Sequence, residues 1–149
     1  MKKLFFVDII TTLHVLLFLY ASISKLMDYS LFYEQLVASP ILAPISKSVA
    51  FAVPTIEIII VIMIIIPRLK LKGFYLSTIV VSSFTLYIIA ILLRSENIPC
   101  SCGGLLEELT WEQHIFFNIS FIILTILGII CQQKIQAENK NKMSLILNT

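Results

Sequence analysis

The chain has 149 residues, of which 58% are hydrophobic and 13% charged, and its mean hydropathy is +0.97. This composition excludes an ordinary water-soluble domain, because too few polar side chains remain to cover a surface in water. The formal net charge of +2 gives no indication of a nucleic-acid partner, and we expect none.

Four apolar runs are long enough to cross a bilayer, which takes about 20 residues of helix. They cover Leu4–Ser24, Ser48–Ile66, Phe74–Leu93 and Gln113–Cys131. We therefore predict an all-α membrane protein, with a four-helix transmembrane bundle over residues 1–133 and a polar tail over 134–149. The first run is longer than the apolar core of a typical signal peptide and carries Asp8 and His14, so we interpret it as a membrane helix.

The distribution of basic residues predicts how the chain crosses the membrane, because loops that stay in the cytoplasm are rich in lysine and arginine. With the N-terminus inside, eight such residues lie on the cytoplasmic side and three on the outer side. The inner set is Lys2, Lys3, Arg68, Lys70, Lys72, Lys134, Lys140 and Lys142, and the outer set is Lys25, Lys47 and Arg94. We therefore expect a multi-pass protein of the bacterial inner membrane, with both termini in the cytoplasm.

The segment after the first span is less apolar but still periodic. Its large apolar residues recur at helical spacing: Tyr29, Phe32, Tyr33, Leu36 and Val37. This pattern predicts a short amphipathic helix on the outer membrane surface, which Pro40 and Pro44 would end. A plain loop is the alternative.

Glu57 interrupts the second span about nine residues, or roughly 13 Å of helix, beneath its outer end. A carboxylate at this depth is costly, so it must face the bundle and be paired or protonated. His14, midway along the first span, and Lys25, which reaches in from its outer end, are the candidate partners. The carboxyl either belongs to a structural clasp that fixes helix register or handles protons for a bound quinone.

The third span contains no charged residue but several small hydroxylated ones. These are Ser77, Thr78, Ser82, Ser83 and Thr85. Such side chains let helices approach closely and hydrogen-bond to one another, so we expect this helix to pack in the interior of the bundle.

The loop before the fourth span contains two of the three cysteines, Cys100 and Cys102. A disulfide closed over one intervening residue is strained and therefore easy to reduce, and the predicted outer location is oxidising. This pair suits thiol–disulfide exchange. The alternatives are a small structural clip, two unpaired thiols, or a soft-metal site completed by His114, although a full tetrahedral ligand set is absent.

The start of the fourth span is marked by Thr110 and Gln113, whose spacing predicts a capping box. His114 and Asn118 share one helix face just beneath the cysteine loop. His114 can promote formation of a thiolate or accept its proton, and the alternative is an interfacial polar residue without chemistry. Cys131 lies about 26 Å further along this helix, and we interpret it as an inert buried thiol.

Several short motifs occur here in a characteristic order: residues 22–26 (SISKL), 54–57 (PTIE) and 99–104 (PCSCGG), followed by Trp111, His114 and Asn118. In this ordered set the chain resembles the MauE branch of the DoxX-like membrane proteins, from about Leu4 to Gln133. The namesake of that branch serves the maturation of methylamine dehydrogenase beside a thioredoxin-like protein. The resemblance implies a membrane thiol–disulfide component with a periplasmic thioredoxin-like or client protein as partner.

The predicted function is thiol–disulfide exchange between the outer cysteine pair and an extracytoplasmic protein. The candidate catalytic residues are Cys100, Cys102 and His114. The candidate cofactor-binding residues are Glu57, Asn118, His14 and Lys25, with a quinone between the helices as candidate electron acceptor. The alternative is a non-enzymatic subunit that binds and stabilises a larger membrane or periplasmic complex, and metal handling is a third hypothesis.

Overall fold

The computed structural model describes residues 2–93 and 110–147, and within these ranges every regular element is a helix. The elements are α1 (Lys2–Met27), α2 (Tyr29–Ala38), the 3-10 turn η1 (Ala43–Ile45), α3 (Ser46–Ile65), α4 (Lys70–Leu92) and α5 (Trp111–Leu147). In the described part of the chain, four helices are long and apolar enough to cross a membrane. The predicted all-α membrane fold is confirmed.

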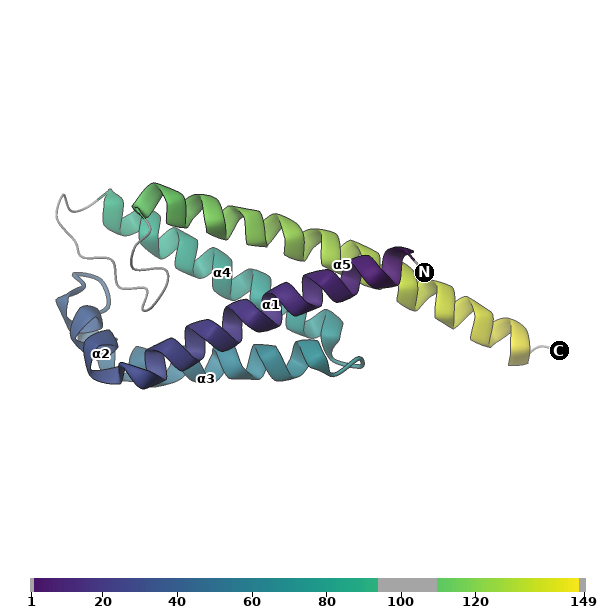
Figure 1. The fold of residues 1–149 in the computed structure, drawn as a ribbon, viewed down its shortest axis with the longest axis horizontal. Coiled ribbons are helices and arrows are strands. Elements are labelled where there is room, and N and C mark those ends of the chain that lie inside the picture. The colour runs from purple at the N-terminus through teal and green to yellow at the C-terminus, as the bar shows by residue number, and fades with distance from the viewer. Residues whose placement is uncertain (1, 94–109, 148–149) are drawn as a thin grey trace.

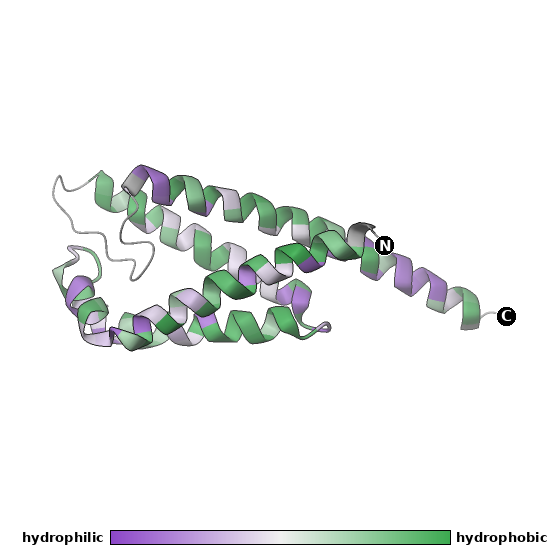
Figure 2. Cartoon of the chain, viewed as in Figure 1, coloured by the Kyte–Doolittle hydropathy of each residue, from purple (hydrophilic) through white to green (hydrophobic). Residues whose placement is uncertain are grey.

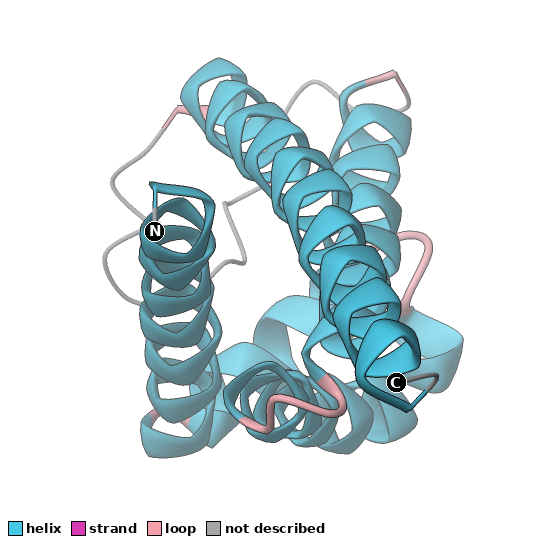
Figure 3. Cartoon of the chain, turned by 90° about the vertical axis from the view of Figure 1, so that its right-hand side faces the viewer, coloured by secondary structure: helices cyan, strands magenta, loops and turns pink. Residues whose placement is uncertain are grey.

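The four long helices form a ring in which neighbours run in opposite directions (Figure 1). Helix α1 packs against α3 and α5, and α4 packs against the same two helices from the other side. The end-on view in Figure 3 shows the N-terminus and the end of α5 at the same end of the bundle. The start of α1 and the end of α5 therefore lie at the same end of the bundle, and the location of both termini in the cytoplasm stays a prediction.

Hydrophobic residues predominate along the four long helices, except in the last part of α5 (Figure 2). Large hydrophobic side chains are exposed on every long helix, among them Phe5, Leu16, Ile62, Leu86 and Phe116. A contiguous apolar surface of this extent is unfavourable in water and is what a helix presents to lipid.

The interior contains one main apolar cluster from the four long helices and a smaller one beneath α2. The main cluster comprises Val7, Ile10, Phe18, Ile60, Val61, Ile64, Phe74, Val81 and Ile129. In the smaller cluster, Phe32 and Leu36 of α2 pack against Ala50 of α3. The short helix is thereby held over the end of the bundle at which α3 begins.

The predicted short helix after the first span is confirmed by α2, which ends at Ala38, before Pro40. The Ser39 side chain follows it and accepts hydrogen bonds from the backbone N–H groups of Ile41 and Leu42. The Tyr87 hydroxyl of α4 donates a hydrogen bond of 2.8 Å to the same Ser39 oxygen. The end of α2 is thus tied to α4 as well as to α3.

The helix bounds differ from the prediction most at the end of the chain. Helix α5 does not stop at Cys131 but continues to Leu147, so the polar tail is helical as far as that residue. Residues 132–147 contain three Gln and three Lys, together with Leu, Met, Glu and Ala, and no Gly or Pro. These are good helix formers, so nothing in the sequence stops the helix where the apolar run ends.

The hydroxylated residues of the third span lie partly in the interior. Ser77 and Thr85 are buried. The Thr78 hydroxyl donates a hydrogen bond to the carbonyl of Phe74, and the Thr85 hydroxyl donates one to the carbonyl of Val81, both in the same helix. These two hydroxyls therefore bond within α4, and the small side chains allow close packing.

Gly73 of α4 gives the first testable prediction. A Cβ atom there would lie 2.8 Å from Cγ1 and 2.9 Å from the backbone nitrogen of Ile64, in α3. Because backbone cannot shift without moving the helix, Gly73→Ala should lower the free energy of unfolding by on the order of 1–3 kcal/mol. Thermal unfolding of the purified protein in detergent would measure this loss.

Gly128→Ala is the matched control, because a Cβ there would meet Cγ2 of Ile10 at 3.2 Å, which is a side-chain atom that can yield. Alanine is also a better helix former than glycine by about 1 kcal/mol. We expect this variant to unfold near the wild-type temperature. Equal destabilisation by the two substitutions would contradict the close approach of α3 and α4.

Candidate functional site

A cavity of about 440 Å³ lies near the end of the bundle that is covered by α2. Most of its lining is apolar, and the polar and charged residues that line it come from four helices. These are Lys25 of α1, Glu57 of α3, Ser83 and Tyr87 of α4, and His114 and Asn118 of α5. Four predicted site residues, from three spans, therefore meet at one cavity.

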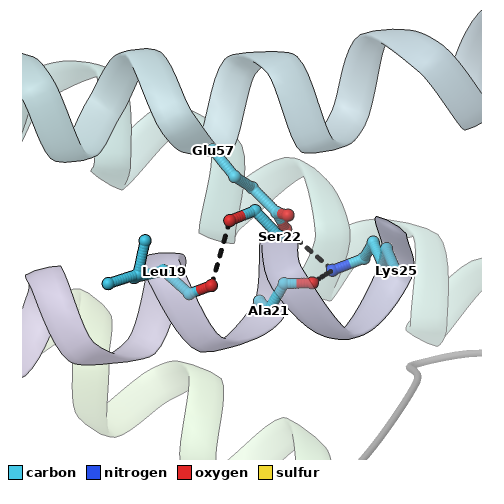
Figure 4. Close-up of polar contacts among 5 residues, drawn as sticks. All are labelled: Leu19, Ala21, Ser22, Lys25 and Glu57. Atoms are coloured by element: carbon cyan, nitrogen blue, oxygen red, sulfur yellow. Dashed lines mark hydrogen bonds and ion pairs between the residues drawn. The ribbon is translucent and has the colours of Figure 1, made fainter. Parts of the chain in front are cut away.

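Lys25 and Glu57 form a buried ion pair across the contact of α1 and α3 (Figure 4). The Lys25 ammonium donates to Oε1 of Glu57 at 2.8 Å and to the carbonyl of Ala21 at 3.1 Å. It also lies 5.9 Å from the ring centroid of Phe32, a distance at which the ring face attracts a cation. Of the two candidate partners for Glu57, the structure selects Lys25.

His14 lies elsewhere and does not line the cavity. Its Nδ1 donates a 2.8 Å hydrogen bond to the carbonyl of Ile10, and its Nε2 lies 2.6 Å from Oγ1 of Thr125 on α5. The Thr125 hydroxyl also donates to the carbonyl of Phe121 in its own helix. The ring also makes edge contacts with Phe74 and Phe121. This arrangement ties α1 to α5, and the structure does not bring His14 to the other site residues.

His114 and Asn118 lie one helical turn apart on α5 and both line the cavity. Only 1% of the His114 surface and 6% of the Asn118 surface are exposed. The His114 ring meets the edge of Phe84 at a centroid distance of 5.5 Å. Both side chains therefore lie inside the bundle and not at its lipid-facing surface.

Three buried polar atoms at the cavity lack a hydrogen-bond partner among the residues that the structure describes. They are Oε2 of Glu57, Nδ1 of His114 and Nδ2 of Asn118. A buried polar atom without a partner costs about 1–3 kcal/mol. Their convergence on one cavity makes this cavity the candidate functional site.

The first turn of α5 is fixed by the predicted capping box, which is confirmed. The Thr110 N–H donates to Oε1 of Gln113 at 3.0 Å, and the Gln113 N–H donates to Oγ1 of Thr110 at 3.4 Å. The His114 N–H also donates to the Thr110 carbonyl at 2.9 Å. The cap thereby sets the position of His114 directly after the cysteine loop.

The cysteines fall into two groups. Cys100 and Cys102 lie outside the described residues, between the end of α4 at Leu92 and the start of α5 at Trp111. Cys131 is an unpaired, half-buried thiol that packs against the main apolar cluster. Over the described ranges, no three His, Cys, Asp or Glu side chains gather closely enough to hold a metal ion.

A comparison with protein families matches residues 3–131 to the family described as methylamine utilisation protein MauE. The chain belongs to the MauE family. The match covers α1 to α4, the cysteine loop and the apolar part of α5, so the suspected resemblance is confirmed. Neither the comparison with curated proteins nor the comparison with solved structures gives a significant match.

Some interior contacts of this MauE-family protein, at the cavity and away from it, were not predicted from the sequence. The aromatic contacts of Phe32 and Phe84 and the bond between His14 and Thr125 depend on which helices are neighbours. Thr125 did carry a signal, because it is an isolated hydroxyl in the apolar run of α5. An isolated polar residue in such a run needs a partner on a facing helix.

The ion pair yields a second prediction. Lys25→Met and Glu57→Gln should each lower the free energy of unfolding, because each leaves the other partner buried without its counter-charge. Breaking a buried pair costs on the order of 3–5 kcal/mol in soluble proteins, and interactions between membrane helices are often weaker. The double variant should lose less than the sum of the two single variants in detergent unfolding.

Asp8 and Lys70 provide a control pair, because they are 3.5 Å apart and 68% of the Asp8 side chain is exposed. When the two single variants and the double variant of this pair are compared in the same way, the interaction free energy of Asp8 and Lys70 should stay below about 1 kcal/mol. A Lys25–Glu57 coupling no larger than this would argue against a buried clasp between α1 and α3.

Proposed function

We propose that this MauE-family protein is a membrane thiol–disulfide component of the bacterial inner membrane. In this proposal Cys100 and Cys102 face the periplasm and exchange their disulfide with a thioredoxin-like protein or a client protein undergoing maturation. The observation that carries the proposal is the position of the cysteine loop. It joins α4 to α5, and the first turn of α5 carries a buried histidine at a cavity where three polar atoms have no partner among the described residues.

The exchange conserves thiols and disulfides. A thiolate of the partner attacks one sulfur of the Cys100–Cys102 disulfide, which gives a mixed disulfide and releases the other thiol. The second thiol of the partner then resolves this bond, so the partner is oxidised and the two cysteines are reduced. His114 is the candidate to accept or return the proton of the released thiol.

Return to the disulfide requires an electron acceptor, because closing the bond releases two electrons and two protons. Cys131 is unsuited to accept them as a second thiol. It lies on α5 about 26 Å from His114 by helical rise, on the part of the helix that leads toward the opposite end of the bundle. The acceptor must therefore bind next to the loop, and the cavity offers the space.

A second candidate function is a non-enzymatic subunit that binds and stabilises a larger complex, with the cysteines as a clip. One observation favours it. Helix α5 extends to Leu147, beyond the family match that ends at residue 131, and residues 136–146 are exposed along it. A helix that exposes polar residues over 136–142 and the apolar residues Met143, Leu145 and Ile146 near its end offers a surface to another protein.

Trapping separates these two functions. In Cys102→Ser the remaining Cys100 thiol has no neighbour to resolve a mixed disulfide, so a partner protein should accumulate in a covalent complex. Non-reducing gels followed by mass spectrometry would identify it, and Cys100→Ser should be tested in parallel. The control variant Cys131→Ser should capture nothing. The absence of any covalent complex in both loop variants would favour the structural clip.

The outer location of the loop is tested separately. A membrane-impermeant maleimide added to intact, reduced cells should label Cys100 or Cys102 and leave Cys131 unlabelled until lysis. This follows from the eight basic residues on the predicted inner side and three on the outer side. Labelling of Cys131 before lysis would reverse the topology and remove the oxidising environment that the exchange requires.

A further inference from the structure

We propose that the cavity binds the ring of a lipid-soluble quinone, with His114 and Asn118 hydrogen-bonded to one ring oxygen and Glu57 facing the other. The inference rests on the proposed function for the electron donor, whereas the binding itself depends on the cavity alone. Oxidation of two thiols to a disulfide releases two electrons and two protons, and reduction of a quinone to a quinol takes up the same number.

The wall formed by α5 supplies hydrogen-bond donors. Nδ2 of Asn118 is always a donor, and Nδ1 of His114 is one when it carries the ring proton. Both atoms are buried and lack a partner among the described residues. Since the two residues are one turn apart on one face, their N–H groups can both reach one carbonyl oxygen, which has two lone pairs.

The opposite wall is formed by α3, which lies across the ring from α5. Lys25 engages only Oε1 of Glu57, so Oε2 remains without a partner at the cavity. A carboxylate oxygen can accept a hydrogen bond from the hydroxyl group of a quinol. It cannot bond to the carbonyl oxygen of a quinone, because both are acceptors. The site should therefore bind the quinol more tightly than the quinone.

The charges at the cavity favour a neutral ligand. Lys25 and Glu57 compensate each other, so the described residues that line the cavity leave no free cation for a carboxylate or a phosphate head. A ring with oxygens at two opposite ends meets the donors on α5 and the acceptor on α3 together. A fatty-acid or phospholipid chain has no group for both walls and would leave these buried polar atoms unpaired.

The dimensions and the lining agree with such a ring. The volume of about 440 Å³ lies within the range of small-molecule pockets, about 300–1,000 Å³. Phe18, Phe84 and Phe117 line it, and aromatic side chains can pack against a flat ring. Ile56 also lines the cavity and is 36% exposed on the lipid-facing surface, which gives an isoprenoid tail an apolar exit.

Direct binding tests the proposal in protein that lacks the loop thiols. The Cys100→Ser/Cys102→Ser protein, reconstituted in lipid nanodiscs, would be titrated with decylubiquinone and with its quinol by calorimetry. We expect saturable binding of both forms. Asn118→Leu and His114→Phe, which remove a donor at similar volume, should each weaken binding by about tenfold.

Asn139→Leu is the matched control, because Asn139 is exposed near the far end of α5 and the same substitution there should leave binding unchanged. Glu57→Gln should reduce the preference for the quinol over the quinone, since an amide can donate to a carbonyl. Unsaturable uptake, or equal binding by Asn118→Leu and Asn139→Leu, would indicate an acyl-chain cavity and overturn the proposal.

The outcomes separate this inference from the proposed function. If no specific quinone binding is found while mixed disulfides are trapped, the inference fails and the thiol exchange stands with another acceptor. If quinone binds specifically while no partner is trapped, the binding site stands and the exchange fails. Oxidation of the reduced wild-type thiols by added decylubiquinone should occur only if both are correct.

Discussion

The buried pair of Lys25 and Glu57 is the interaction on which the site depends. Two charges inside an apolar bundle are costly, and they are tolerated because the ammonium meets the carboxylate at 2.8 Å and a backbone carbonyl at 3.1 Å. This requirement fixes the relative position of α1 and α3 along the membrane normal. It also turns only one carboxylate oxygen toward Lys25, and the other is left for the cavity.

Helix α1 makes a polar contact with each of the other three long helices, at three different levels. Lys25 meets α3 near the end covered by α2, His14 meets Thr125 of α5 near the middle, and Asp8 meets Lys70 of α4 toward the N-terminal end. Apolar packing alone gives little directional preference between helices in lipid, because lipid tails are as apolar as the side chains. We infer that these contacts set the register of the ring, the two buried ones more strongly than the exposed pair.

The bundle is organised differently at its two ends. Toward the chain termini, Gly73 brings α3 and α4 into close contact and the main apolar cluster fills the interior. Toward the cysteine loop the helices enclose the cavity, and α2 covers it through Phe32 and Leu36. The capping box at Thr110 then fixes where α5 starts, so that His114 faces the interior in the first turn. One end is therefore closely packed, and the other contains the cavity.

The sequence by itself determined the fold class, because apolar runs of about 20 residues have few alternatives to membrane helices. It also determined the start of α5 at its capping box and the need for a partner for Glu57, since these follow from local hydrogen bonds and the cost of a charge in lipid. For the segment that forms α2, the periodicity predicted a helix but left a plain loop as the alternative. The sequence did not determine that Lys25 and not His14 is the partner of Glu57, nor that Phe32 and Phe84 line the same cavity. Those facts depend on which helices are neighbours and how each is rotated about its axis. Only the tertiary structure decides this, because a helix that is apolar on every face carries no periodic signal for the side that turns inward.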